Sequence, residues 1–141
     1  MTSATLAARM LRSYPRDFNV DAGVLAECIA ACSDCASACT LCADDCLSEQ
    51  NVAELVKCIR LDLDCADVCA ATGRIVSRQT EYDANLTRAA LQACIAACRS
   101  CGEECARHDM DHCQRCAAAC RSCAAECRRM AAGASSAAAG R

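Results

Sequence analysis

Cysteine occupies most of the positions at which a packed helix normally carries a larger apolar side chain. In the stretch CIAACSDCASACTLCADDC, residues 28–46, six cysteines are separated by steps of four, three, four, three and four. Such steps average about 3.5 residues, the period of a helix face that packs against neighbouring helices along its length. Charged residues fall between the cysteines, where they can face water. The pattern therefore predicts amphipathic helices whose buried face is made of thiols.

The same pattern predicts one short helix followed by several long ones. The short helix spans residues 3–14 and ends at Pro15, because proline cannot continue a helix. The long helices span about residues 21–47, 52–78, 86–107 and 112–130, and polar segments at 48–51, 79–85 and 108–111 separate them. Long helices with short connections favour an antiparallel up-down-up-down arrangement. The expected fold class is all-α, a four-helix bundle with a short extra N-terminal helix.

We expect one bundle domain with a flanking segment on each side. The bundle spans residues 20–130, and residues 1–19 form the short helix and a linker. Residues 131–141 are rich in alanine and have nothing large to bury, so a disordered tail is predicted there. Within the bundle, CIAACSDC at 28–35 returns as CIAACRSC at 94–101. This repeat indicates that the two halves of the bundle are copies of one helical hairpin.

Aliphatic side chains are too few to fill the core of such a bundle. Leu, Ile, Val and Phe together make up 21 of 141 residues, a fraction below the ~20% under which chains tend toward disorder. Disordered chains usually combine low hydrophobicity with high net charge, whereas the net charge here is only -3. The 18 cysteines must therefore supply much of the core.

We predict that every cysteine, one carboxylate and both histidines are metal ligands. The cysteines are Cys28, Cys32, Cys35, Cys39, Cys42, Cys46, Cys58, Cys65, Cys69, Cys94, Cys98, Cys101, Cys105, Cys113, Cys116, Cys120, Cys123 and Cys127. The carboxylate is Asp62, at the seam position where the second long helix lacks a cysteine. Asp62 either faces the core, where it needs a metal or a hydrogen-bond donor, or turns to solvent and leaves Leu61 inward. The histidines are His108 and His112.

A thiol-lined core has three explanations. Cysteines acting only as small apolar side chains would underfill the core and lower its stability. Disulfides between positions four apart on a helix have unfavourable torsions, and a column of cross-helix bridges is unexpected in a reducing compartment. Thiolates are soft ligands that select Cu(I), Zn(II) or iron–sulfur clusters. Metal binding best explains both the number and the regular spacing of the cysteines.

Among these metals, the spacing favours Cu(I). Zinc and iron–sulfur sites use discrete ligand groups, usually on turns or loops, whereas the CxxC pairs here run into one another within continuous helices. Cu(I) accepts few ligands and lets one thiolate bridge two ions, and each ion neutralises one buried negative charge. We therefore expect multiple Cu(I) ions per chain. A zinc- or cadmium-sequestering protein of the metallothionein type is the alternative, and the number of metal ions per thiol distinguishes the two.

The two ends of the predicted bundle differ in polarity. One end gathers Cys46, Asn51, Cys105, His108, His112 and Cys113, and the other gathers Val24, Leu25, Thr72, Ile75, Val76, Leu86, Leu91 and Met130. Because neutral imidazole binds copper, we predict that metal enters and leaves at the histidine end; the alternative is a pair of surface histidines without partners. Met110 is a candidate soft ligand, whereas Met10 and Met130 are interpreted as fillers of packing gaps.

Other functional classes find little support. A pI near 5.3 and an aromatic fraction of 2% argue against a nucleic-acid partner. The chain lacks a phosphate-binding loop and a nucleophile elbow, and no cysteine pair stands out as that of a thiol redox enzyme, so we expect no enzymatic activity. Arg9 and Arg12 interrupt the N-terminus, which does not resemble a secretory signal. No stretch approaches the ~18 apolar residues of a membrane span, so the expected location is the cytoplasm, without a membrane partner.

The stripes CIAACSDCASACTLCADDC, CIAACRSCGEEC and CQRCAAACRSCAAEC, with RHDMDHC between the last two, resemble the bacterial copper storage proteins over about residues 20–130. The resemblance implies a cysteine-lined four-helix bundle that holds many Cu(I) ions along its axis, in a homotetramer. Histidines or methionines line the open end in that family, and His108 and His112 match the histidine variety. The missing export signal resembles the cytosolic branch, and a copper chaperone or another acceptor protein is the expected recipient of released ions.

Overall fold

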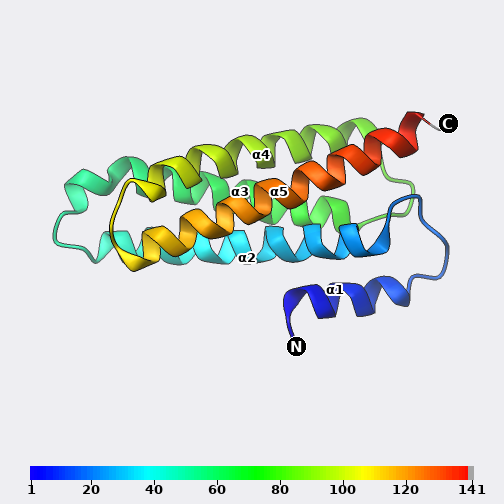
Figure 1. Ribbon diagram of the computed structural model, residues 1–141, viewed down its shortest axis with the longest axis horizontal. Coiled ribbons are helices and arrows are strands. Elements are labelled where there is room, and N and C mark those ends of the chain that lie inside the picture. Colours follow the sequence, from blue (N-terminus) through cyan, green and yellow to red (C-terminus); the bar gives the residue numbers. More distant parts are fainter. Residues whose placement is uncertain (140–141) are drawn as a thin grey trace.

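The computed structural model describes residues 1–139, with side chains as far as residue 133. Its elements are α1 (Ser3–Arg12), α2 (Ala22–Leu47), the 3-10 turn η1 (Val52–Leu55), α3 (Val56–Ser77), α4 (Ala84–Ala106) and α5 (Asp111–Ala139). The four long helices α2 to α5 run alternately in opposite directions, and α1 lies outside them (Figure 1). The prediction of an all-α, antiparallel four-helix bundle with an extra N-terminal helix is confirmed.

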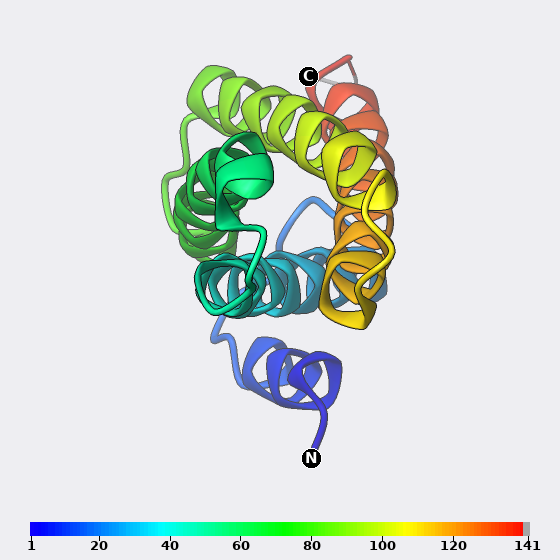
Figure 2. The same cartoon turned by 90° about the vertical axis from the view of Figure 1, so that its left-hand side faces the viewer.

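The long helices form a closed ring around the bundle axis. Helix α2 packs against α3 and α5, and α4 packs against the same two helices. In the end view of Figure 2 the four helices surround a common centre, and α1 lies against the outer side of α2. Each long helix therefore turns one face toward the axis, and that face is its cysteine stripe.

The helix starts follow from local capping chemistry. The side chain of Asp21 accepts a hydrogen bond from the backbone N–H of Val24 at 2.9 Å and so opens α2. The side chain of Asp83 caps α4 in the same way, through the N–H of Leu86 at 2.9 Å. Such caps satisfy backbone donors that have no partner within the helix. The cap at Asp83 explains why α4 begins at Ala84 instead of the predicted residue 86.

The C-terminal end of the bundle differs from the prediction. The fourth long helix was expected to end near Met130, with a disordered tail over residues 131–141, but α5 continues to Ala139. The segment after Met130 consists mainly of alanine, which has the highest helix propensity of all residues and continues a helix without tertiary support. The predicted end of the fourth long helix near Met130 is therefore wrong, whereas the division of the chain into a bundle and a tail stays a prediction; residues 140–141 lie outside the described residues. The boundaries of the bundle domain stay predictions.

Polar and apolar contacts attach α1 to the outside of the bundle. Ser3 Oγ donates a hydrogen bond to Asp34 Oδ1 at 3.0 Å, and the hydroxyls of Tyr14 and Thr80 lie 2.9 Å apart. Ala7 is buried, whereas Met10 remains 64% exposed. The interpretation of Met10 as a filler of a packing gap is therefore wrong, because its helix covers the surface of α2 and does not enter the core.

The end of the bundle away from the histidines is closed by apolar side chains, as predicted. The fully or almost fully buried members of this plug are Leu25, Thr72, Val76, Leu91 and Met130. Leu86 does not belong to it and is 57% exposed. It lies in the first turn of α4, directly after the cap, on the side that faces solvent. Burial of Met130 agrees with its interpretation as a packing residue.

One helix in the described part of the chain, α2, is long and apolar enough to cross a membrane by length and composition alone. The expectation that no segment reaches this level was therefore wrong. Alanine and cysteine account for most of the apolar character of α2, and its cysteines are buried against the other helices of the bundle. A core helix with such a composition meets the same criterion as a membrane span.

Glycine allows two of the helix pairs to approach closely. A Cβ atom added at Gly73 in α3 would lie 3.0 Å from the Cβ of Cys32 in α2. A Cβ atom added at Gly102 in α4 would lie 3.3 Å from the Cβ of Cys120 in α5. Since real Cβ atoms rarely come so close, these glycines bring the thiol faces of neighbouring helices together.

Candidate metal centre

All 18 cysteines face the interior of the bundle. None is more than 2% exposed, and every one is a free thiol. The inward, unoxidised arrangement that the spacing predicted is thus present on all four long helices. The four stripes meet because each helix in the ring turns the same heptad-like face to the axis.

The sulfur atoms form a continuous network across the helices. The Sγ atoms of Cys69 and Cys98 lie 3.5 Å apart, as do those of Cys58 and Cys105. The Sγ atom of Cys35 lies 3.9 Å from that of Cys98 and 3.8 Å from that of Cys120. Ligands at these separations can converge on a shared ion with small side-chain movements.

Sets of four sulfur atoms within 4.8 Å of one another follow the bundle axis. They include Cys32, Cys94, Cys123 and Cys127; Cys35, Cys69, Cys98 and Cys123; Cys35, Cys39, Cys65 and Cys120; Cys39, Cys101, Cys116 and Cys120; and Cys42, Cys46, Cys58 and Cys113. Neighbouring sets share members, because Cys35, Cys39, Cys120 and Cys123 each belong to two of these five. The sets are therefore parts of one column and cannot all be filled as independent four-ligand sites.

The buried charges of the column favour a monovalent ion. Asp62 and Glu104 are the buried charged residues, and no lysine or arginine in the described part of the chain is buried. Zinc with four thiolates leaves a net charge of −2 per site, which nothing here would compensate. One monovalent ion per thiolate leaves the core nearly neutral, and uncompensated charge in a low-dielectric interior is costly.

The structure resolves the orientation of Asp62, which points into the column and is fully buried. Its Oδ1 atom accepts hydrogen bonds from the thiols of Cys101 at 3.0 Å, Cys105 at 3.2 Å and Cys116 at 3.4 Å. Burial raises the pKa of Asp62 to about 7, and the hydrogen bond from Cys101 counteracts part of this rise. A carboxylate oxygen therefore takes the place of a sulfur atom at this level of the column.

Two thiols at the histidine end, those of Cys46 and Cys113, are protonated in the metal-free protein. Burial raises the pKa of Cys113 to about 11, and it also raises the pKa of Cys46. The cause is desolvation, which disfavours the thiolate in an interior without compensating cations. Metal binding at these residues must therefore displace protons.

The two histidines lie at the end of the column but in different surroundings. His112 Nδ1 is 3.4 Å from the Sγ atom of Cys42 and 3.5 Å from that of Cys113, while its Nε2 atom is 3.1 Å from Glu49 Oε1. A proton on Nε2, donated to Glu49, leaves the Nδ1 lone pair facing the two sulfur atoms. The Nδ1 atom of His112 is thus within reach of any metal ion that Cys42 and Cys113 could hold.

His108 is held by a carboxylate instead of lying against sulfur. Its Nε2 atom is 2.8 Å from Glu104 Oε2, and Arg107 Nη1 lies 3.6 Å from the other oxygen of Glu104. The histidine side chain is 19% exposed, whereas that of Glu104 is only 10% exposed. His108 therefore stands outside the thiol column, at its opening. Met110 is half-buried nearby and packs against the core.

Sequence reasoning missed Glu49 and Glu104, the carboxylates that orient the two histidines. Carboxylates that hydrogen-bond a ligand histidine fix its tautomer and ring orientation. Glu104 lies in the last turn of α4 and precedes His108, two residues beyond the helix end, by four residues, a spacing that could have indicated the pair. Glu49 lies in the connection after α2, far from His112 in sequence, and no local pattern links the two.

A four-helix bundle filled by a column of free thiols, with a histidine-bearing opening and an apolar plug, defines a thiolate metal-storage protein. The sequence model described as "copper storage protein" matches residues 22–132. This match covers α2, α3 and α4 and most of α5, and the chain belongs to the copper storage protein family.

Solved structures of that family resemble this chain in fold and sequence. The copper storage protein Ccsp from Streptomyces lividans, loaded with 10 copper equivalents, is 56% identical, with a TM-score of 0.88 over 90% of this chain and 98% of that one. A structure of copper loading to a cytosolic copper storage protein from the same organism is 58% identical, with a TM-score of 0.76 over 77% and 92%. The Cu(I)-bound copper storage protein BsCsp3 is 44% identical, with a TM-score of 0.67 over 74% and 94%.

Proposed function

We propose that this protein is a cytosolic reservoir that stores many Cu(I) ions on the cysteine thiolates of its core. The observation that carries the proposal is the column of overlapping four-sulfur sets. Soft thiolates select Cu(I), and ions that share bridging thiolates make use of every sulfur in such a column. The family relationship and a relative described as cytosolic support both the cargo and the location.

The non-cysteine ligands have distinct roles in this proposal. Asp62 supplies an oxygen to the ions bound by Cys101, Cys105 and Cys116, whose thiols already point at it. His112 binds incoming ions together with Cys42 and Cys113. His108 binds ions transiently at the opening, before they reach the thiols and after they leave them. Metal therefore enters and leaves at this end, because the opposite end is closed by the apolar plug.

Storage requires no bond to be made or broken in an organic substrate, so the proposal includes no enzymatic activity. A thiol redox enzyme needs an exposed, activated cysteine, whereas every thiol here is at most 2% exposed. By family resemblance we propose a homotetramer, with a copper chaperone or another acceptor protein as the recipient of released ions.

An anaerobic titration of the reduced protein tests the proposal. With Cu(I) as titrant we expect binding to saturate near one ion per thiol. Since the chain has 18 cysteines, this means about 18 ions per chain. Zinc, titrated in parallel, should saturate at about one ion per four thiols and should be displaced by Cu(I). Protein whose thiols have been alkylated under denaturing conditions is the control and should bind almost no metal. Saturation with only a few Cu(I) ions, or failure of Cu(I) to displace zinc, would contradict the storage role.

A further inference from the structure

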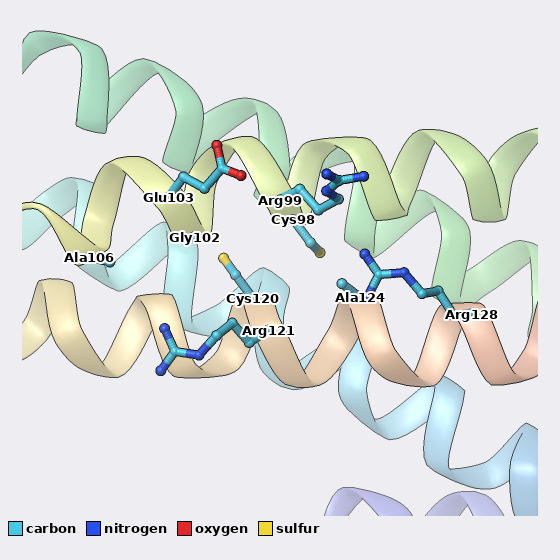
Figure 3. Close-up of a pocket in the computed structure, with 9 residues that line it drawn as sticks. All are labelled: Cys98, Arg99, Gly102, Glu103, Ala106, Cys120, Arg121, Ala124 and Arg128. Atoms are coloured by element: carbon cyan, nitrogen blue, oxygen red, sulfur yellow. The ribbon is translucent and has the colours of Figure 1, made fainter.

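A groove on the side of the bundle, between α4 and α5, has a volume of about 420 Å³. It runs along the helices from Ala106, at the end of α4, to Arg128 in α5 (Figure 3). The arginines Arg99, Arg121 and Arg128 line it from both helices, and Cys98 and Cys120 belong to its inner wall. The groove therefore combines a basic rim with sulfur atoms of the metal column.

The three arginines give this groove a positive charge on an acidic protein. Glu103 is the acidic residue of the lining, so the local balance is three positive side chains against one negative, whereas the whole chain has a net charge of -3. Within the part of the chain that the structure describes, these three guanidinium groups form no ion pair or side-chain hydrogen bond. In contrast, Arg60, on α3, pairs with Asp64 at 3.0 Å. Free guanidinium groups around one depression are suited to bind carboxylates.

The wall between this groove and the metal column is thin. Gly102 has no side chain, and the remaining small lining residues are Ala106 and Ala124. Cys98 keeps 1% of its surface exposed, and its Sγ atom lies within 3.9 Å of those of Cys35 and Cys69. A metal ion that reaches Cys98 therefore joins the middle of the column directly.

We propose that this groove binds a small, anionic Cu(I)–thiolate complex and passes its ion to Cys98 through the side of the bundle. The proposal rests on the copper storage function and adds a second route for loading. The carrier is a low-molecular-weight thiol with carboxylate groups, because the arginines recognise anions and thiolates are soft ligands that select Cu(I). A volume of about 420 Å³ fits a ligand of this size, since small-molecule pockets measure ~300–1,000 Å³.

The transfer is a ligand exchange without a change in oxidation state. Two Cu–S bonds to the carrier break, and two form, to Cys98 and to a neighbouring column thiol such as Cys35, 3.9 Å away. The protons of the two cysteines pass to the departing carrier thiolates. Copper remains Cu(I), and the carrier leaves with protonated thiols, which no longer bind the ion.

Loading rates from two carriers of opposite charge test this inference. The anionic carrier is the Cu(I) complex of glutathione, and the cationic carrier is the Cu(I) complex of acetonitrile. The groove variant replaces Arg99, Arg121 and Arg128 by glutamine; a control variant with the same net charge replaces Arg60, Arg78 and Arg115, which are exposed outside the groove. Loading is followed anaerobically by the ultraviolet absorption of Cu(I)–thiolate bonds, at low and high salt.

We expect the groove variant to load about tenfold more slowly from the glutathione complex at low salt, because a basic site raises the local concentration of an anion. Its rate from the acetonitrile complex should equal that of the unchanged protein, and the control variant should behave normally with both carriers. High salt should remove the difference between the variants. Replacement of the same three arginines by lysine keeps the charge and should restore most of the rate.

Equal slowing of both glutamine variants would assign the effect to overall charge and overturn the inference. Equal slowing from both carriers, or no slowing from glutathione, would overturn it as well. If the glutamine variant does not fold, citrate can be tested as a competitor of glutathione-dependent loading of the unchanged protein. Inhibition by citrate would support loading through the groove, and its absence would refute it. Failure of the storage function is distinguishable, because then neither carrier would load any variant.

Discussion

Replacement of Asp62 by asparagine separates the electrostatic cost of this buried carboxylate from its role in metal binding. Asp62 is fully buried among thiols, and burial raises its pKa from 3.8 to about 7. The folded, metal-free protein therefore holds a proton between about pH 4 and pH 7 that the unfolded chain releases. Since the folded state binds more protons in this window, the contribution of Asp62 to stability falls as the pH rises through it.

The magnitude follows from the same values. A pKa raised from 3.8 to about 7 corresponds to at most about 4 kcal/mol of lost stability above pH 7. Asparagine carries no charge, but its amide N–H groups find only weak sulfur acceptors in this environment. We therefore expect Asp62→Asn to stabilise the reduced, metal-free protein by about 2 kcal/mol at pH 8 and to be nearly neutral or destabilising at pH 4.5.

Urea unfolding of the reduced protein, followed by far-ultraviolet circular dichroism under anaerobic conditions, measures this difference. The thiols titrate in both proteins, so their contributions largely cancel in the comparison. Asp67→Asn is the matched control, because Asp67 is an exposed residue of the same helix, and we expect it to change stability little at either pH. A stability change for Asp62→Asn that is the same at both pH values, or a loss at pH 8, would refute the reasoning.

Further predictions concern the histidine end, the protons of the thiols and the helix contacts. Alanine at both His108 and His112 should change the rates of Cu(I) loading and release more than total capacity in stopped-flow and titration experiments; halved capacity at unchanged rates would contradict this picture of the opening. Because burial raises the pKa of Cys113 to about 11, Cu(I) binding should release protons, and competition with a chelator should show weaker binding at pH 6 than at pH 8; pH-independent binding would contradict proton displacement. Gly73→Ala should destabilise the metal-free protein by about 1–3 kcal/mol through its contact with α2, whereas Gly133→Ala, with nothing within 4 Å of the added Cβ, should be neutral or stabilising; equal melting temperatures would refute the packing argument.

Local sequence pattern predicted the long helices well, because their stability depends on neighbours three and four residues away. The cysteine spacing also predicted which face of each helix is buried, since a helix can bury only one stripe in a bundle of this kind. Boundaries were less well predicted, because α5 continues through an alanine-rich segment to Ala139 and η1 precedes α3. In both places the backbone preferences of the residues, and not the cysteine pattern, determine where the helix begins or ends.

Several features of the site depend on contacts between distant segments and were beyond any local pattern. The orientation of Asp62 depends on the rotation of α3 relative to α4 and α5, whose thiols donate to it. The association of Glu49 with His112 depends on how the connection after α2 meets the start of α5. The exposure of Leu86, predicted as part of the plug, depends on where α4 begins.

The sequence by itself determined that four cysteine stripes must be buried together, because a regular spacing near 3.5 residues leaves a helix no other way to hide them. Only the tertiary structure decided which sulfur atoms share a set, which histidine touches sulfur and where a basic groove approaches the column. The physical reason is that helical period is a local property, fixed within a few residues, whereas rotation, offset and neighbour choice of packed helices are set by the whole core at once.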